Sequence, residues 1–169
     1  VKFDGVVWTT YTESDGLASN FVTSIAFDSS GNKWFGTTKG ATKFDGVNWV
    51  IYTRAHGLVE TSVSSLAVDG DGNIWIGAAG PYGGGVTKFD GTNYRSFQIT
   101  ETNSIVFDAI GNKWFGTVSG VDKYDNKSLN MYSTDDGLVS NIVQCIAIDA
   151  YGVKWFGTAG GGVSKMWGD

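Results

Sequence analysis

Hydrophobic and small residues alternate in short runs along the chain, first at residues 22–27. An Asp-x-x-Gly segment at residues 28–31 separates this run from a second one at residues 33–37. Two further runs follow at residues 41–45 and 49–52, with Asp-Gly between them. Short hydrophobic runs between turn signals predict β-strands, and no segment offers an amphipathic helix of useful length.

The same order of four runs recurs along the chain. The phrase Lys-Trp-Phe-Gly-Thr, or a close variant, occurs at residues 33–37, 74–78, 113–117 and 154–158, and its Trp residues are 41, 39 and 41 positions apart. A period of about 40 residues with four short strands per unit is typical of β-propeller blades. We name these strands a, b, c and d.

The sequence therefore predicts an all-β protein, a single β-propeller or propeller segment over residues 1–169, with about four four-stranded antiparallel blades. The predicted units are residues 1–11 (c and d strands), 21–52, 62–97, 102–132 and 142–169.

Each repeated Trp follows an Asp by six positions and a Gly by three. These Asp and Trp residues are Asp28 and Trp34, Asp69 and Trp75, Asp108 and Trp114, and Asp149 and Trp155. One blade cannot bury both faces of its sheet, so we expect the Trp side chains to fill the space between stacked blades, and the Asp side chains to shape the turns.

The two ends of the chain hold unequal parts of a blade. The chain opens with a c and a d strand at residues 1–11 and ends, at residues 142–169, with a, b and c. We expect the N-terminal d strand to complete the last blade. Two geometries fit: one molecule closing as a four-bladed ring, or two molecules exchanging ends in an eight-bladed ring.

Charge and composition exclude several classes of partner. The net charge is −5, and Lys and Arg, 12 in all, form no cluster, so neither nucleic acid nor an anionic membrane surface is expected as a partner. The apolar runs are too short to span a bilayer. The single cysteine, Cys145, is expected to be a small strand residue and leaves the redox compartment open.

Residues 15–37 carry a more specific signal. They contain Asp-Gly-Leu, then Asn-Phe-Val-x-x-Ile, Asp-x-x-Gly and Trp-Phe-Gly-Thr, and the pattern recurs at residues 136–158 and in part at 56–78. This order resembles the two-component regulator propeller repeat of bacterial sensor proteins. The resemblance implies a sensing module, periplasmic or extracellular, in which propellers help to detect oligosaccharides.

The repeat departs from this pattern at two places. The third unit has residues 99–103 where Gly-Leu and its loop are expected, and the second inserts residues 80–84 between strands b and c. Because variation gathers in the d–a and b–c loops, which emerge on one face of a propeller, we expect ligand binding on that face.

Polar residues in these loops are the candidate ligand contacts. They are Asp15, Asn20, His56, Tyr82, Asp136 and Asn141, with Glu60 and Glu101 beside them. Each also has a structural explanation, since Asp and Asn shape loops through bonds to the backbone. Tyr82 is the most suggestive, because an aromatic ring on a glycine-rich insertion can stack on a sugar.

Metal and cofactor sites are not expected. Residues 69–73 imitate the start of a calcium loop, but Ile74 and Gly80 stand where the loop requires Gly and Glu. With one histidine, His56, and no Ser-His-Asp set, catalytic residues are not assigned either.

Three functions remain. The preferred one is a non-catalytic module that binds carbohydrate or a protein partner. The alternatives are a propeller-type lyase or hydrolase that uses loop carboxylates, and a structural fragment that assembles into a complete ring as a homo-oligomer.

Overall fold

The computed structural model describes residues 1–81 and 83–168, which form short antiparallel strands. Three sheets contain four strands each, in chain order. Each sheet is one blade, and blade 1 consists of β3 (Val22–Phe27), β4 (Lys33–Thr37), β5 (Gly40–Phe44) and β6 (Trp49–Tyr52). Blade 2 consists of β7 (Val63–Val68), β8 (Ile74–Ala78), β9 (Gly85–Phe89) and β10 (Tyr94–Phe97). Blade 3 consists of β11 (Thr102–Phe107), β12 (Lys113–Thr117), β13 (Gly120–Tyr124) and β14 (Leu129–Tyr132).

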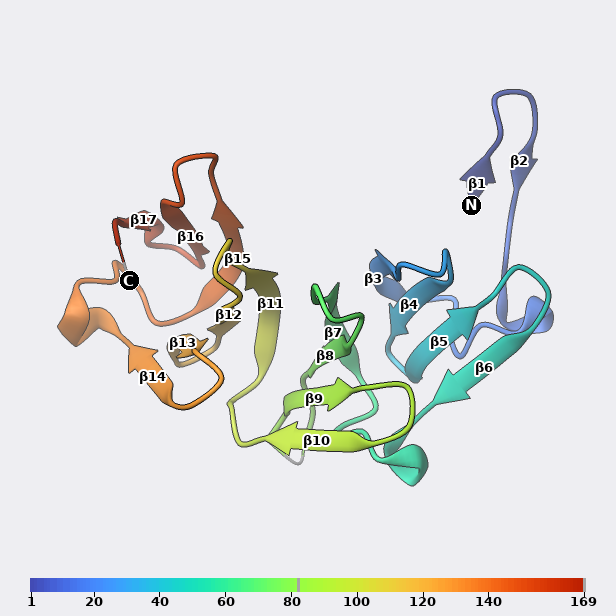
Figure 1. The fold of residues 1–169 in the computed structure, drawn as a ribbon, viewed down its shortest axis with the longest axis horizontal. Coiled ribbons are helices and arrows are strands. Elements are labelled where there is room, and N and C mark those ends of the chain that lie inside the picture. Colours follow the sequence, from blue (N-terminus) through green and yellow to red (C-terminus); the bar gives the residue numbers. More distant parts are fainter. Residues whose placement is uncertain (82, 169) are drawn as a thin grey trace.

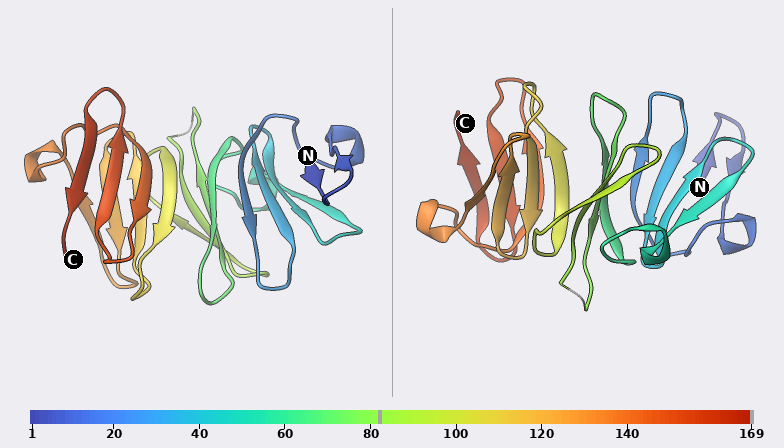
Figure 2. Two further views of the ribbon diagram at one scale, coloured as in Figure 1. Left: turned by 90° about the horizontal axis from the view of Figure 1, so that it is seen from above. Right: turned by 60° about the horizontal axis from the view of Figure 1, so that its bottom comes forward.

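Blade 4 has three strands, β15 (Val143–Ile148), β16 (Lys154–Thr158) and β17 (Gly162–Met166). A separate hairpin, β1 (Lys2–Phe3) with β2 (Trp8–Thr9), precedes blade 1. The blades lie side by side along an open arc, with the a strands on its inner side and the d strands on its outer side (Figures 1 and 2). The predicted all-β blade architecture is confirmed.

Three 3-10 turns interrupt the strands, η1 (Glu13–Asp15), η2 (Arg54–His56) and η3 (Thr134–Asp136). They are the helical segments of the described residues, and none is long and apolar enough to cross a membrane.

Each a–b turn is held by the Asp that the repeat places at its start. In blade 1, Asp28 Oδ1 accepts hydrogen bonds from the backbone amides of Ser30 and Asn32, and Gly31 adopts a φ of 79° that favours glycine. Asp28 Oδ2 also accepts the indole Nε1–H of Trp34 at 3.0 Å. The same Asp–Trp bond, at 2.7 to 3.0 Å, occurs in the other three blades. The six-residue spacing in the sequence thus encodes a hydrogen bond that locks the turn to strand b.

The hydrophobic core is divided among the interfaces between blades. Between blades 1 and 2, Trp34 of one sheet packs with Leu66, Ile76 and Phe89 of the next. Trp34, Trp75 and Trp114 are 2%, 1% and 0% exposed, whereas Trp155 of blade 4 is 39% exposed. The first three Trp side chains are buried because a further blade covers the face that carries them.

Close contact between sheets depends on the Gly that follows each repeated Trp-Phe or Trp-Ile pair. A Cβ added to Gly36 would lie 2.7 Å from Val63 Cγ1, and one added to Gly116 would lie 2.9 Å from Val143 Cγ1. The first residue of strand a therefore seats against a glycine of the preceding blade, and a side chain there would push the sheets apart.

The N-terminal strand does not complete the last blade within one molecule, so this part of the prediction is wrong for the single chain. Among the described strands, β17 pairs with β16 alone and β2 pairs with β1. The hairpin and blade 4 lie at opposite ends of the arc (Figure 1). Tyr11 holds β2 at the blade 1 end, since its ring lies 5.5 Å from both Phe44 and Trp49.

We predict that Trp114→Ala lowers the free energy of unfolding by about 3–5 kcal/mol, the usual effect of truncating a buried Trp. Trp155→Ala removes the same ring and the same bond to an Asp, but from a half-exposed site, so its effect is smaller. Urea unfolding at low micromolar chain concentration measures both. If both variants lowered the free energy of unfolding equally, the Asp–Trp hydrogen bond, which both lose, would be the main stabilising interaction, rather than burial of the ring between blades.

Candidate functional site

The predicted site residues of the first loop are engaged in its local structure. Asp15 Oδ2 accepts hydrogen bonds from the backbone amide and the hydroxyl of Thr12, which caps η1. Asn20 Oδ1 accepts the amide of Glu13, and the Glu13 carboxylate accepts the Asn20 amide. These bonds fix the course of the chain into β3, and a ligand-binding role of either residue stays a prediction.

The equivalent loops repeat this arrangement. His56 Nδ1 accepts the amide of Thr53, Asp136 Oδ2 accepts the amide of Ser133, and Asn141 Oδ1 accepts the amide of Thr134. The turns η1, η2 and η3 lie apart on the outer side of the arc (Figure 1). The structure therefore does not bring Asp15, His56 and Asp136 together in one site. Tyr82 lies outside the described residues.

The two irregular segments of the sequence, by contrast, meet. Gly84, in the b–c insertion of blade 2, approaches the connection between blades 2 and 3 so closely that an added Cβ would lie 2.8 Å from Glu101 Cα. That connection has four residues, Gln98–Glu101, where the connection from β6 to β7 has ten, residues 53–62. The shortened connection has no 3-10 turn, and Ile99, 7% exposed, supplies its buried aliphatic side chain.

A groove opens where these two segments meet, with a volume of about 550 Å³. Its lining combines glycines, three hydrophobic residues, and an arginine, a serine, a glutamine and a threonine. The lining residues are Arg54, Val59, Gly83, Gly84, Ser96, Phe97, Gln98, Ile99 and Thr100. None of the five candidate ligand contacts that the structure describes, Asp15, Asn20, His56, Asp136 and Asn141, lies in this lining. The sequence signal for the groove was the pair of departures from the repeat, not any single polar residue.

Glu60 lies beneath the insertion on the same face. Its side chain is 5% exposed, and an added Cβ on Gly80 would lie 2.5 Å from it. One carboxylate oxygen accepts the amide of Thr61, and the other has no hydrogen-bond partner among the described residues. The Glu60 carboxylate is thus packed under the insertion where the equivalent residue of blade 1 is Ser19.

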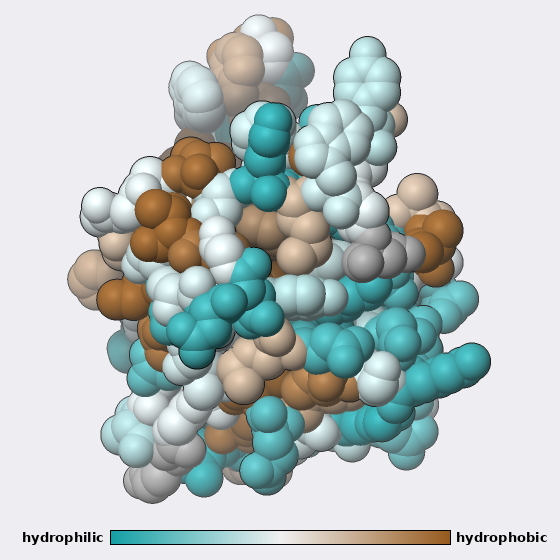
Figure 3. Space-filling view, turned by 90° about the vertical axis from the view of Figure 1, so that its left-hand side faces the viewer, coloured by the Kyte–Doolittle hydropathy of each residue, from teal (hydrophilic) through white to brown (hydrophobic). Residues whose placement is uncertain are grey.

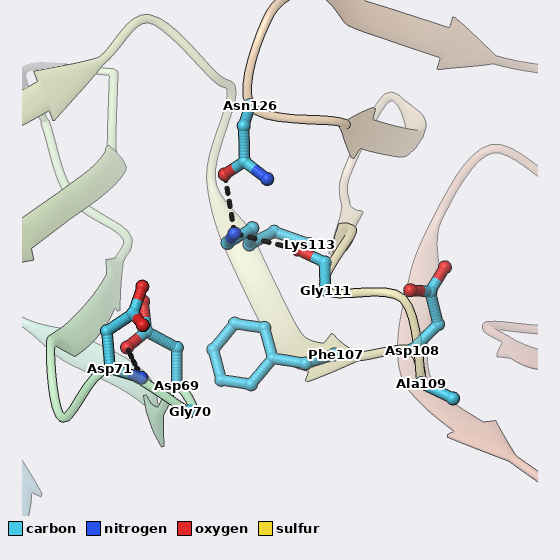
Figure 4. A pocket seen from close by; sticks show the side chains of 9 residues that line it. All are labelled: Asp69, Gly70, Asp71, Phe107, Asp108, Ala109, Gly111, Lys113 and Asn126. Carbon is cyan, nitrogen blue, oxygen red and sulfur yellow. Dashed lines mark hydrogen bonds between the residues drawn. The ribbon is translucent and has the colours of Figure 1, made fainter.

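A second hollow, of about 380 Å³, lies on the opposite face between the a–b turns of blades 2 and 3. Figure 4 shows Lys113 donating hydrogen bonds to the Gly111 carbonyl and to Asn126, with Asp69 and Asp71 across from it. Burial alone would raise the pKa of Asp108, but hydrogen bonds from Trp114 and Asn112 outweigh it and lower that pKa. The Asp69 and Asp108 carboxylates accept hydrogen bonds from their own turns and from the Trp side chains of strand b, so these two groups are not available to bind a ligand in this hollow.

Burial raises the pKa of the Asp122 carboxyl from 3.8 to about 6. It lies on β13 and is 6% exposed. Its counterparts Thr42 and Thr87 each accept a loop amide at 3.0 Å, from Ala18 and Val59. The loop that would supply this amide in blade 3 is the shortened connection.

We predict that Asp122→Thr stabilises the protein at neutral pH. Because the folded-state pKa is raised, the stability associated with protonated Asp122 is present below about pH 4 and is lost as the pH rises through about 6. The variant is expected to gain about 1–2 kcal/mol at pH 7.5 and nothing at pH 4.

Urea unfolding at both pH values measures this difference, and Asp71→Asn, on an exposed turn, is the control. A gain of the same size at pH 4 and pH 7.5 would show that burial of the charge is not its cause.

The sequence pattern described as "Two component regulator propeller" matches residues 16–39 and 57–80, which end with the b strands of blades 1 and 2. The chain contains two-component regulator propeller repeats. The predicted resemblance is thereby confirmed. A comparison with curated proteins finds no match.

Solved structures share the blade arrangement. The extracellular domain of a putative hybrid two component system from B. thetaiotaomicron is 24% identical, with a TM-score of 0.81 over 92% of this chain and 23% of that one. The extracellular domain of a putative one component system from the same organism is 22% identical, with a TM-score of 0.73 over 88% and 22%. This chain thus spans about a quarter of their length.

Virginiamycin B lyase from Staphylococcus aureus is also similar, at 12% identity and a TM-score of 0.66, over 86% of this chain and 55% of that one. At these identities the likenesses show the propeller fold. Within the described residues, no group of three or more His, Cys, Asp and Glu side chains is placed to hold a metal ion.

Proposed function

We propose that this chain is the ligand-binding part of a periplasmic or extracellular sensor and that it does not catalyse a reaction. Its repeats and its similarity to the extracellular domains of two-component and one-component systems support the sensor role. The ligand that we propose is a short oligosaccharide, bound in the groove between residues 83–84 and 96–100.

One observation carries this proposal: the insertion and the shortened connection both border this groove. An array that only has to stack needs neither departure from the repeat. Irregular loops on a rigid scaffold are where proteins place recognition.

The lining suits a sugar better than an apolar ligand. Its volume of about 550 Å³ lies within the range of about 300–1,000 Å³ of small-molecule sites. Ser96 and Thr100 supply hydroxyl groups and Gln98 an amide, each able to donate and accept hydrogen bonds. Phe97 also borders the groove, and its half-buried ring packs against Trp75 and Tyr124, which fixes the end of β10 at the groove.

The lyase or hydrolase alternative needs carboxylates that converge on one substrate. Asp15 and Asp136 lie on separate turns, and each accepts hydrogen bonds from its own turn. The similarity to virginiamycin B lyase concerns the fold. The loop carboxylates that suggested a lyase or hydrolase lie apart, so they do not support this alternative.

Isothermal titration with a panel of neutral and uronic-acid oligosaccharides tests the proposal. We expect at least one to bind, Ser96→Trp to abolish binding by filling the groove, and Gln98→Ala to weaken it about three- to tenfold through a lost hydrogen bond. Thr92→Trp, an exposed c–d turn residue, is the matched control and leaves binding unchanged. Binding that survives Ser96→Trp, or a panel without a single binder, would overturn the proposal.

A further inference from the structure

The 3-10 turn that borders the groove differs in charge from its two equivalents. The turn η1 contains Glu13 and Asp15, and the turn η3 contains two aspartates, so both are acidic. The turn η2 contains Arg54 and His56 and has no acidic residue. In a chain with a net charge of −5 this is a local reversal of charge, and it occurs in the turn whose first residue, Arg54, lines the groove.

We infer that the groove selects an oligosaccharide that carries an oxyanion, either a carboxylate or a sulfate group, and that Arg54 binds this oxyanion. The inference rests on the proposed function and names the class of ligand for the same groove. A guanidinium group binds an oxyanion through two parallel hydrogen bonds. Because it has five N–H donors, it can do so while it keeps other contacts.

The equivalent side chain in blade 1 indicates where this position of the turn points. Glu13 Oε1 accepts the amide of Asn20, and Glu13 Oε2 forms an ion pair with Lys39 Nζ at 3.3 Å. Lys39 belongs to the b–c turn of blade 1, and the insertion of blade 2 takes its place. By this equivalence the Arg54 side chain extends toward the insertion, where the groove lies.

The turn η2 keeps the cap of the repeat without its negative charge. In η1 the Asp15 carboxylate accepts the amide of Thr12, and in η2 Nδ1 of His56 accepts the amide of Thr53 at 3.1 Å. Because a backbone amide can only donate, Nδ1 is unprotonated, and the neutral imidazole carries its proton on Nε2. The cap is thus preserved, while the carboxylate that would repel an anion bound at Arg54, two residues away, is absent from this turn.

Two carboxylates lie near the insertion but outside the groove. Neither Glu60 nor Glu101 belongs to the lining. Glu60 is 5% exposed and is packed against Gly80. Among the described residues that line the groove, Arg54 is the only charged one. The described lining therefore favours an anionic ligand over a cationic one.

Isothermal titration with matched pairs of oligosaccharides tests this inference. The pairs are oligogalacturonate and alginate oligosaccharide, each with its carboxyl-reduced form, and carrageenan oligosaccharide with its desulfated form. We expect the acidic member of at least one pair to bind about tenfold or more tightly than its neutral partner, because charge-assisted hydrogen bonds are the stronger ones. The uronates and the carrageenan distinguish a carboxylate from a sulfate.

Two variants test the turn itself. Arg54→Gln is expected to weaken binding of the acidic member about tenfold and to leave the affinity for its neutral partner unchanged. His56→Asp restores the residue that η1 carries at this position, keeps the cap, and is expected to weaken the acidic member about threefold through repulsion alone. Raising the salt concentration weakens binding of the acidic member and not of the neutral one.

Arg95→Gln is the matched control, because it removes the same charge from the neighbouring strand β10. The Arg95 guanidinium lies over the rings of Phe97 and Tyr124, at 4.9 and 5.9 Å from their centroids, and Arg95 is outside the lining. We expect this variant to bind both members of a pair as the wild-type chain does. Circular dichroism checks that all variants fold.

The outcomes separate this inference from the proposed function. If neutral members bind as tightly as acidic ones, or if Arg54→Gln leaves an acidic preference unchanged, the inference is overturned and oligosaccharide binding in the groove stands. If no member of any pair binds, or if binding survives Ser96→Trp, the proposed function itself is overturned. An acidic preference that Arg95→Gln reduces as much as Arg54→Gln does would reflect overall charge and overturn the role of Arg54.

Discussion

The structure depends on contact between one blade and the next. A four-stranded sheet with apolar side chains on both faces cannot bury both by itself. The Trp-bearing faces of blades 1, 2 and 3 are each covered by the a and b strands of the following blade. Burial of Trp34, Trp75 and Trp114, and exposure of Trp155, follow directly from whether such a blade is present. Glycine at the contact brings the backbones close, and the Asp–Trp bond sets the orientation of the indole within that space.

This stacking also defines where the chain is free to vary. Positions between blades are constrained by their neighbours on both sides, but the d–a and b–c loops are constrained only at their ends. In most loops the available polar groups are used for local structure, as in the caps that Asp15, His56 and Asp136 make on their own turns. Between blades 2 and 3 the loop is too short for this structure, and a groove lies there instead. The same shortening leaves Asp122 buried without the loop amide that its counterparts accept.

Stacking between blades also explains the exposed hydrophobic side chains at the two ends of the array, such as Ile25 and Val163. Figure 3 faces the blade 4 end and shows hydrophobic side chains at its surface among hydrophilic ones. Because stacking is a relation between neighbours, a linear series of blades must leave one face of each kind uncovered. The two faces are complementary by construction, since every interior interface joins one of each.

The sequence by itself determined the repeat, the strand order within each blade and the turn chemistry, because these are local: a period of about 40 residues, a hydrophobic run of four to six residues, and an Asp and a Gly at fixed distances from a Trp. It also located the loop face and the two departures at residues 80–84 and 99–103. It did not identify Ser96, Gln98 or Thr100, since these polar residues differ in no way from others in short strands and loops.

Only the tertiary structure decided that the insertion and the shortened connection border one groove, that Asp15, His56 and Asp136 lie apart, and that the ends of a single chain do not meet. Each of these depends on how far the chain is carried by successive interfaces between sheets. Such distances accumulate from side-chain packing across the whole array, and no local spacing in the sequence records them.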